Sequence, residues 1–283
     1  DLAGLCGTPT KEVFLRGLQF STFQPLMRSG GDSTKQPWDF GETAVKVYLK
    51  HFWLRENLIP LIYSSAVKSH KTGLPMTEPM AAAFPNDLSV RRTGSEYMFC
   101  GEILFSPVLS EGAEKQTVIF PAGNWYGIFD DTVYHGGQTL EIPVTLKFSP
   151  AYIRSGAVIP VKVTESLELM KPLGDGAMHA LLITPPTEAR RHRYYKDSES
   201  CTEFTVQKAN GDFSVSASGE NNFKYAIILC DAAYAECDGM TLKKYDLVKD
   251  ICNKSGYAVS HGKTYIHSEN GFKQLTISLQ EAE

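Results

Sequence analysis

The fold is decided by two short stretches near the start of the chain, DLAGL at residues 1–5 and RSGGDSTKQPWDFG at residues 28–41. Between them, Thr8-Pro9 and the apolar spacing that follows predict a helix over residues 9–20. A carboxylate on a glycine loop, a helix and then an arginine-bearing loop is how strand-end loops of a (β/α)8 barrel bring polar groups to a pocket. Because no strand precedes Asp1, we expect the chain to begin inside a fold.

Two further helical stretches follow these loops. Apolar residues recur at helical spacing from Glu42 onwards, and another helix is predicted from Pro60 to about residue 71, closed by Gly73. Pro60 should break or kink this pair, because its ring clashes with the carbonyl four residues earlier. The apolar run at 20–27 is interrupted by a proline and fits either a buried strand or an irregular segment. The first quarter of the chain is therefore mainly helical.

Beyond the predicted helices the pattern changes to short strands. Runs such as TVIF at 117–120 and TLEI at 139–142 are separated by clusters of Gly, Pro, Asn and Asp about every 8–12 residues. This spacing is typical of β-sandwiches. A second β-rich part starts near residue 164 and includes ALLI at 180–183 and LTIS at 275–278. The patterns thus predict a helical part followed by two β-rich parts.

Composition excludes several classes of protein. With 283 residues, 42% apolar and 21% charged, the chain has the composition of a soluble globular protein. A net charge of -4 gives no basic footprint for nucleic acid, and we interpret RRHR at 190–193 as a solvated strand end or turn. No apolar run approaches the ~18 residues of a membrane helix. We therefore expect neither nucleic acid nor membrane as a partner.

The cysteines and histidines give no support for a metal or another cofactor. There is no C-x-x-C pair and no zinc-type spacing between the cysteines and the seven histidines. Reduced thiols are the favoured interpretation, with a disulfide among the four cysteines after residue 200 as the alternative. The compartment stays open, with the cytoplasm slightly favoured over secretion. The six cysteines are Cys6, Cys100, Cys201, Cys230, Cys237 and Cys252.

Eight stretches, taken in their order and spacing, resemble glycoside hydrolase family 31, the retaining α-glucosidase and α-xylosidase family. The resemblance is close over residues 1 to about 161 and loose beyond. Any one stretch is weak, whereas the ordered set is specific. The stretches are DLAGL at 1–5, EVFLRGLQF at 12–20, RSGGDSTKQPWDFG at 28–41, LIPLIYS at 58–64, TGLPM at 72–76, SEYMFCGEILFSPV at 95–108, FPAGNWY at 120–126 and IRSGAVIP at 153–160.

The resemblance implies a mixed fold in which the C-terminal segment of a (β/α)8 barrel is followed by two all-β sandwich domains. Residues 1–80 would be the last part of the barrel, 81–163 a proximal β-sandwich and 164–283 a distal one. The helical, β and β order of the sequence patterns agrees with this layout.

Retaining cleavage needs two carboxyl groups about 5–5.5 Å apart, one as nucleophile and one as general acid/base. In the family both precede the loop that DLAGL resembles, so the resemblance implies that neither is in this chain. The expected function is the C-terminal part of a retaining α-glycosidase that hydrolyses α-linked glycosides. This chain alone is then predicted to be inactive.

Asp1 and Arg28 are the polar groups that the resemblance assigns to the far wall of the sugar pocket. Asp1 could accept hydrogen bonds from sugar hydroxyls or orient an arginine, and its alternative is a turn carboxylate. Arg28 could hold a pocket carboxylate in its ionised form, and its alternative is a structural salt bridge.

Gly30 is the departure from the family pattern, R-S-H-G-T-D, which has a histidine at this position. The lost donor usually costs a few kcal/mol of transition-state binding unless the substrate differs. Altered specificity is the favoured interpretation of Gly30, and a degenerate site is the alternative.

Other candidates are given structural roles. Trp38 is interpreted as a packing anchor rather than a sugar-stacking surface, and Phe23 and Trp53 as core. His51 and His70 are expected at surface or hydrogen-bonded positions. The YYKDSE turn at 194–199 is expected to be structural, although it loosely resembles a family turn.

Two other functions stay open at this point, a non-catalytic carbohydrate-binding module and a scaffold. The expected partners are the carbohydrate substrate and the N-terminal remainder of the enzyme, in the same or another chain, with a homo-oligomer as a further possibility. Barrel strands cut from their neighbours expose apolar faces, so we expect the upstream part to be needed for solubility unless residues 1–80 pack differently.

Overall fold

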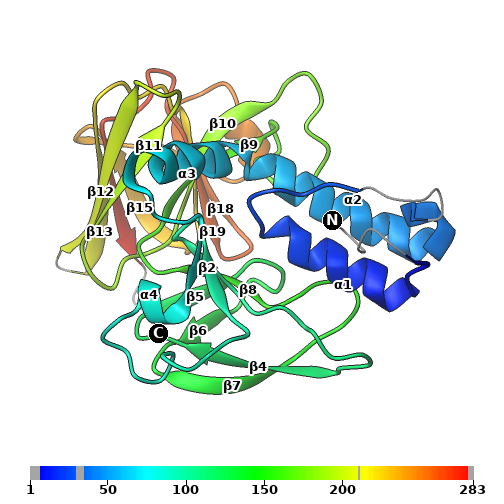
Figure 1. Ribbon diagram of the computed structural model, residues 1–283. Helices are drawn as coiled ribbons and strands as arrows, with labels where there is room; N and C mark the ends of the chain where they lie inside the picture. The colour runs from blue at the N-terminus through cyan, green and yellow to red at the C-terminus, as the bar shows by residue number, and fades with distance from the viewer. Residues whose placement is uncertain (1–6, 30–34, 210, 280–283) are drawn as a thin grey trace. The chain divides into compact units, whose positions relative to one another are not determined.

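The computed structural model describes residues 7–29, 35–209 and 211–279, which are mostly β-sheet with few helices (Figure 1). The chain divides into two compact units. Unit 1 comprises residues 1–56 and 75–153, and unit 2 comprises residues 57–74 and 154–283.

The helices of unit 1 lie close to their predicted positions. The helix predicted at 9–20 is confirmed as α1 (Lys11–Thr22), which begins later because Thr10 is its N-cap and accepts the Val13 N–H at 3.3 Å. The chain forms no strand between the end of α1 and residue 29. Of the two alternatives for residues 20–27, the irregular segment is therefore confirmed and the buried strand is wrong. The remaining helices are η1 (Pro37–Phe40), α2 (Glu42–Asn57) and the short α4 (Met80–Ala83).

Helices α1 and α2 pack against each other through a small apolar core, and they are adjacent in Figure 1. The apolar residues of α1 that enter this core recur three and four positions apart, which puts them on one face of the helix. The fully or nearly buried members are Phe14, Leu15, Leu18, Ala44 and Val47.

The strands of unit 1 form a six-stranded sheet and a two-stranded one. A second core of unit 1 is built around Trp125, whose Nε1–H donates to the Pro121 carbonyl at 2.8 Å. The six-stranded sheet has the order β1 (Thr77–Pro79), β2 (Tyr97–Phe99), β3 (Ile103–Phe105), β8 (Ala151–Arg154), β5 (Asn124–Gly127), β6 (Val133–His135), and the other pairs β4 (Lys115–Phe120) with β7 (Gln138–Pro143).

Unit 2 contains two six-stranded sheets that share one large apolar core. Pairing is antiparallel except for β10 with β14 and β17 with β18. The first sheet has the order β17 (Lys244–Tyr245), β18 (Gly256–Ser260), β19 (Lys263–His267), β14 (Tyr225–Ile228), β10 (Met178–Ile183), β9 (Val158–Val163). The second has the order β11 (Arg190–Tyr195), β12 (Cys201–Ala209), β13 (Asp212–Ser218), β20 (Gln274–Leu279), β15 (Ala232–Cys237), β16 (Met240–Thr241).

Two helical elements complete unit 2, α3 (Ile59–Thr72) and η2 (Val248–Ile251). The predicted break at Pro60 and stop at Gly73 are confirmed, since α3 is separate from α2 and ends on Gly73 in the left-handed region, φ 73°. Ser64 of α3 accepts the Tyr195 N–H of the edge strand β11 at 3.0 Å. The predicted strand runs at 117–120, 139–142, 180–183 and 275–278 are all strands of the structure.

The two units do not follow the predicted boundaries at residues 80 and 163. Strand β9 pairs along its length with β10, so residues 158–163 share a sheet with unit 2. The helix α3 likewise belongs to unit 2. The three-part division 1–80, 81–163 and 164–283 stays a prediction about the layout of the whole protein.

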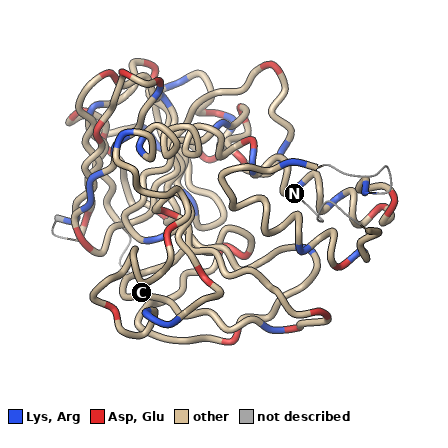
Figure 2. Tube along the Cα trace, viewed as in Figure 1, with Lys and Arg blue, Asp and Glu red and all other residues tan. Residues whose placement is uncertain are grey.

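Charges are interspersed along both units, as Figure 2 shows for the trace of the chain. The RRHR run forms the first four residues of strand β11, so the strand-end interpretation is confirmed and the turn alternative is wrong. Its side chains alternate as a strand requires, with His192 buried and Arg191 and Arg193 exposed. None of the helices in the described part of the chain is both long and apolar enough to cross a lipid bilayer.

Candidate functional site

Of the three predicted pocket residues, the described part of the chain contains one. Asp1 and Gly30 lie outside the described residues, so their predicted roles stay predictions. Arg28 is described and exposed. What the structure does give is how the chain on either side of these positions is held.

Arg55 of α2 holds the segment that leads from α1 to Arg28. Its guanidinium donates to the carbonyl of Thr22 at 3.1 Å, to that of Pro25 at 2.7 Å and also to that of Gln24. Arg55 is 7% exposed, and burial lowers its pKa while the nearby Cys100 and Glu56 raise it. A planar fork of donors is suited to bind several carbonyls at once.

Tyr97 of β2 binds the same segment at Phe23, the one residue of 22–25 whose carbonyl Arg55 does not bind. Its hydroxyl donates to the Phe23 carbonyl at 3.0 Å and accepts the Gln24 side-chain amide at 2.6 Å. The Phe23 ring is fully buried, as predicted, with its centroid 4.7 Å from that of Phe105. Four successive carbonyls, those of residues 22–25, are thus bound by two side chains.

The chain after the undescribed loop residues is fixed by η1. Gln36 and Asp39 cap this turn, with the Gln36 N–H donating to the Asp39 carboxylate at 2.9 Å. Phe40 stacks on Phe14 of α1 with ring centroids 4.5 Å apart. Trp38 is 67% exposed, so its interpretation as a packing anchor was wrong. In this four-residue turn Phe40, not the tryptophan, is the ring that packs.

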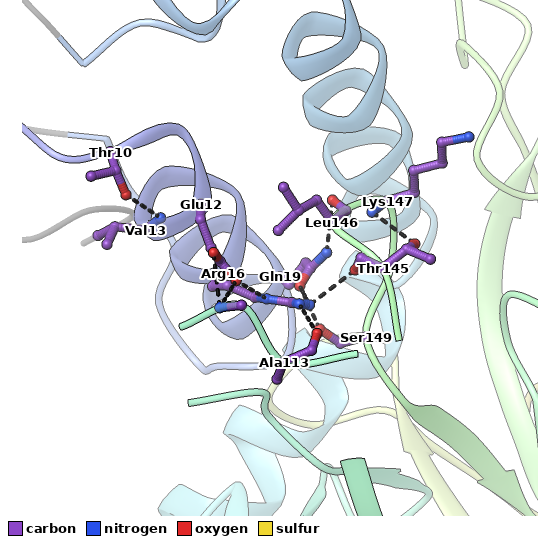
Figure 3. A network of polar contacts seen from close by, with 11 residues as sticks. Thr10, Glu12, Val13, Arg16, Gln19, Ala113, Thr145, Leu146, Lys147 and Ser149 are labelled. Carbon is purple, nitrogen blue, oxygen red and sulfur yellow. Dashed lines mark hydrogen bonds and ion pairs between the residues drawn. The ribbon is translucent and has the colours of Figure 1, made fainter. Parts of the chain in front are cut away.

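The polar face of α1 is attached to two loops of unit 1, as Figure 3 shows. Glu12 accepts the Gly112 N–H with both carboxylate oxygens at 3.1 Å and lies 3.6 Å from Arg16 Nε. Arg16 donates to the carbonyls of Thr145 at 2.9 Å and Ala113 at 3.4 Å. Because Glu12 and Arg16 are four positions apart, their side chains lie on the same side of the helix.

Gln19 continues this face one turn further and is fully buried. Its amide donates to the Leu146 carbonyl at 3.1 Å, and its oxygen accepts the Ser149 hydroxyl at 2.7 Å and an Arg16 N–H at 3.2 Å (Figure 3). The E, R and Q of the EVFLRGLQF stretch therefore fix the position of α1 through backbone groups of residues 112–113 and 145–146. None of them is placed to act on a substrate by these contacts.

Two buried groups of unit 1 have strongly shifted pKa values. Burial lowers the pKa of His51 to about 4, although its Nδ1 bonds the Val47 carbonyl at 3.0 Å. Burial raises the pKa of Glu96 to about 7, opposed by hydrogen bonds from the Ile119 N–H and from Ser106. In the part of the chain that the structure describes, the buried atoms His51 Nε2 and Glu96 Oε2 have no hydrogen-bond partner.

The structure also describes the residues for which the sequence predicted structural roles. His51 is buried and hydrogen-bonded through Nδ1, as expected, although among the described residues its Nε2 has no hydrogen-bond partner, and His70 is exposed as predicted. Trp53, predicted as core, is half-buried. In the turn after β11, Asp197 accepts the N–H groups of Glu199 at 2.8 Å and Ser200 at 2.6 Å, the contacts of a structural turn.

The described residues contain neither a cluster suited to a metal ion nor a disulfide. There, no group of three or more His, Cys, Asp or Glu side chains is arranged to hold a metal ion. The five cysteines of this part of the chain are free thiols.

Sequence reasoning missed Arg55, Tyr97 and Glu96. Arg55 did carry a signal, because it stands next to Leu54 and three residues before Leu58 on the buried side of a predicted helix. An arginine at such a position must bind something inside the protein. Tyr97 and Glu96 lie in a strand-like run and carry no comparable signal.

Two family models match successive parts of the chain. The "Glycosyl hydrolases family 31 TIM-barrel domain" matches residues 1–65, and the "Glycosyl hydrolase family 31 C-terminal domain" matches residues 73–159. Together they cover more than half of the chain.

Curated relatives agree with these matches. An alpha-xylosidase of Saccharolobus solfataricus is 36% identical over 53% of this chain and 21% of its own length. An isomaltosyltransferase of Sporosarcina globispora is 28% identical over 62% of this chain and 17% of its own. The chain thus spans about a fifth of the length of such relatives.

Solved structures share the fold. The cycloalternan-forming enzyme of Listeria monocytogenes, solved with a pentasaccharide substrate, superposes with a TM-score of 0.86 at 23% identity. The match covers 98% of this chain and 29% of that one.

Proposed function

The chain belongs to glycoside hydrolase family 31, and on this premise we propose that it is the C-terminal part of a retaining α-glycosidase that hydrolyses α-linked glycosides. The observation that carries the proposal is the pair of family models, which match consecutive residues in the order barrel, then C-terminal domain. Relatives named as an alpha-xylosidase and as neutral alpha-glucosidases support this substrate class.

For the fold of the whole protein, we propose that residues 1–80 complete a (β/α)8 barrel. The barrel-domain match at 1–65 and the helices α1 and α2 support this assignment. We propose that residues 81–163 and 164–283 are a proximal and a distal β-sandwich. The single core shared by the two sheets of unit 2 supports the distal one.

We place the two reacting carboxyl groups in a part of the protein outside these 283 residues. The chain covers about a fifth of its relatives, and the barrel-domain match takes in only 65 residues of it. Glu96 has the raised pKa of a general acid, but at 4% exposure and bonded to the Ile119 N–H it has no access to a substrate. This chain by itself is then inactive.

The contribution of this chain to the pocket is its far wall, from Asp1, Arg28 and Gly30. Support comes from the attachment of residues 22–25, which lead to Arg28, through Arg55 and Tyr97. The partners in this proposal are the carbohydrate and the upstream remainder of the enzyme, in the same or another chain. A non-catalytic binding or scaffold role is not favoured, since the relatives are named as enzymes.

The test compares the full-length protein with the 283-residue chain on aryl α-glucosides and α-xylosides. We expect turnover only by the full-length protein, and NMR should show the α-anomer of the sugar as the first product. Product analysis at high substrate concentration separates hydrolysis from glycosyl transfer. Turnover by the short chain would contradict our placement of the carboxylates, and no turnover of any α-glycoside by the full-length protein would contradict the function.

Gly30 can be tested in the same assay. If the missing histidine reflects an altered specificity, Gly30→His should weaken turnover of the best substrate found. If it instead improves turnover of ordinary α-glucosides, the site is degenerate.

The proposed partner needs a separate measurement. Size-exclusion chromatography of the isolated 283-residue chain, with its intact mass, should show aggregation or association. A monomer with a cooperative melt would contradict the need for an upstream part.

A further inference from the structure

The C-terminal end of α1 is bound by a side chain from another helix. An α-helix leaves its last carbonyl groups without partners inside the helix, and a positive charge near this end is stabilising. The last turn of α1 contains no basic residue. Arg55, from the next helix along the chain, supplies the charge by donating to Thr22, the final residue of α1.

The same guanidinium continues past the helix end. It donates to the carbonyls of Gln24 and Pro25, and between them the Phe23 carbonyl accepts the hydroxyl of Tyr97. Within the helix turn, the N–H groups of Phe23 and Gln24 donate to the carbonyls of Phe20 at 3.2 Å and Ser21 at 3.3 Å. In this turn the backbone N–H groups of Phe23 and Gln24 bind carbonyls of α1, and the backbone carbonyls of residues 22–25 bind side chains.

The stability of the turn does not by itself explain a buried arginine. Burying a guanidinium among carbonyls is costly in desolvation, and an apolar side chain of similar size often serves stability as well. What the fork of donors adds is geometry, because three bonds from one rigid group fix three carbonyls relative to each other. The fixed segment ends three residues before Arg28.

We propose that Arg55 is a positioning residue for the sugar pocket, which sets the place of Arg28 through the carbonyls of Thr22, Gln24 and Pro25. Tyr97 is its second hold on the same segment. The inference rests on the proposed function, since it needs Arg28 to face the substrate. It adds to that function a group outside the pocket on which turnover depends.

The experiment is a double-mutant cycle in the full-length protein. Arg55→Lys keeps the charge but loses the fork, and Arg28→Lys removes the fork at the pocket. We expect Arg55→Lys to lower kcat/KM by about 10- to 100-fold, since a displacement of about 1 Å can cost ~10²-fold. In the Arg28→Lys background the same change should cost at least about fivefold less, because its effect passes through Arg28.

A control separates positioning from stability. Thr184 in unit 2 is fully buried, donates to the Arg154 carbonyl at 2.7 Å and accepts the Ala157 N–H at 2.8 Å. Thr184→Val keeps its shape and loses both bonds. It should lower Tm and leave kcat/KM unchanged. If Thr184→Val lowers kcat/KM as much as Arg55→Lys at equal loss of Tm, the positioning role is overturned.

A second readout does not depend on activity. Amide hydrogen exchange of residues 22–29 should become faster in Arg55→Lys, whereas Arg16→Lys, the same change at an arginine that binds Thr145 and Ala113, should leave these amides unchanged. Unchanged exchange in Arg55→Lys overturns the inference.

Each failure has its own signature. A wild-type protein that turns over no α-glycoside overturns the proposed function and this inference with it. An active wild type with strictly multiplicative losses in the cycle overturns this inference alone. If Arg55→Lys does not fold, Tyr97→Phe takes its place in the cycle, because it keeps the ring and loses the hydroxyl. The expected losses of kcat/KM are then smaller. Strictly multiplicative losses in this second cycle would also overturn the inference.

Discussion

Units 1 and 2 bury different kinds of side chain. Among the described residues, the buried lysine, arginine and glutamate, Lys35, Arg55 and Glu96, are all in unit 1. Within residues 7–29, 35–209 and 211–279, the three buried side-chain atoms without a hydrogen-bond partner, on Arg16, His51 and Glu96, also belong to unit 1. In unit 2 the buried polar groups are hydroxyls, amides and histidines, such as Thr184 and His192, bonded to backbone carbonyls.

The difference shows two ways of holding elements together. Unit 2 joins its sheets through one apolar core, and apolar burial is strong but not directional. Unit 1 fixes α1 and the segment after it through charged and amide side chains bonded to backbone carbonyls, which specify direction and distance. Such directional contacts suit the pocket wall that we propose for Arg28, because they hold the segment that leads to it.

The largest expected effect is a loss of apolar packing in unit 2. Phe204 is 1% exposed in the shared core, 5.9 Å from Phe223 between ring centroids. Phe204→Ala should lower the free energy of unfolding of unit 2 by about 3–5 kcal/mol, measured by urea denaturation. Phe204→Leu is the control and should cost less than half as much. A loss below about 1 kcal/mol would mean that unit 2 does not depend on this core.

In unit 1, the next effect depends on pH through Glu96. Burial raises its pKa from 4.5 in the unfolded chain to about 7, so the folded protein binds more protons between these values and its stability falls as pH rises. At ~1.4 kcal/mol per pH unit, the loss from pH 4.5 to 7.5 is about 2–3 kcal/mol. Glu96→Gln stays neutral and should remove this loss, which unfolding of both proteins at pH 5 and pH 8 will measure.

His51 gives this prediction its control. Because burial lowers its pKa from 6.5 to about 4, its contribution is present above pH 6.5 and is lost as pH falls through about 4. It therefore opposes Glu96 between about pH 4.5 and 6.5. In Glu96→Gln the stability should rise with pH in this window, and a flat profile would show that His51 is not buried as a neutral ring.

A smaller effect should follow from breaking the polar face of α1. Gln19→Leu leaves the Leu146 carbonyl and the Ser149 hydroxyl without their partner, and should cost about 1–3 kcal/mol of unfolding free energy. Ser149→Ala should cost much less in the Leu-substituted protein than in the wild type. Equal costs of Ser149→Ala in both backgrounds would show that the two side chains act independently.

The smallest effect comes from an ion pair that looks strong by distance. Lys46 Nζ lies 2.6 Å from Glu42 in α2, but the side chains are 73% and 83% exposed. Glu42→Gln should change the free energy of unfolding by no more than about 0.5 kcal/mol. Glu12→Gln, with the same spacing to Arg16 but side chains 22% and 11% exposed, should cost more. The reverse order in Tm would contradict the role of burial.

The sequence alone predicted the helices α1, α2 and α3 and most long strands, because these follow from periodicity and from Thr8-Pro9, Pro60 and Gly73. These signals act within one turn or one strand, so neighbouring residues suffice to determine them. The ordered motifs also indicated the family, which the family models confirm.

Only the tertiary structure decided which side chains hold residues 22–25 and which tryptophan or phenylalanine packs. Arg55 donates to the carbonyls of residues 22, 24 and 25 from 30 or more positions along the chain, and Tyr97 donates to that of residue 23 from more than 70. Trp38 is exposed while Phe40, two residues on, stacks on Phe14. Such contacts join distant segments, and hydrophobicity and spacing carry no information about which distant backbone groups will lie within reach of a given side chain.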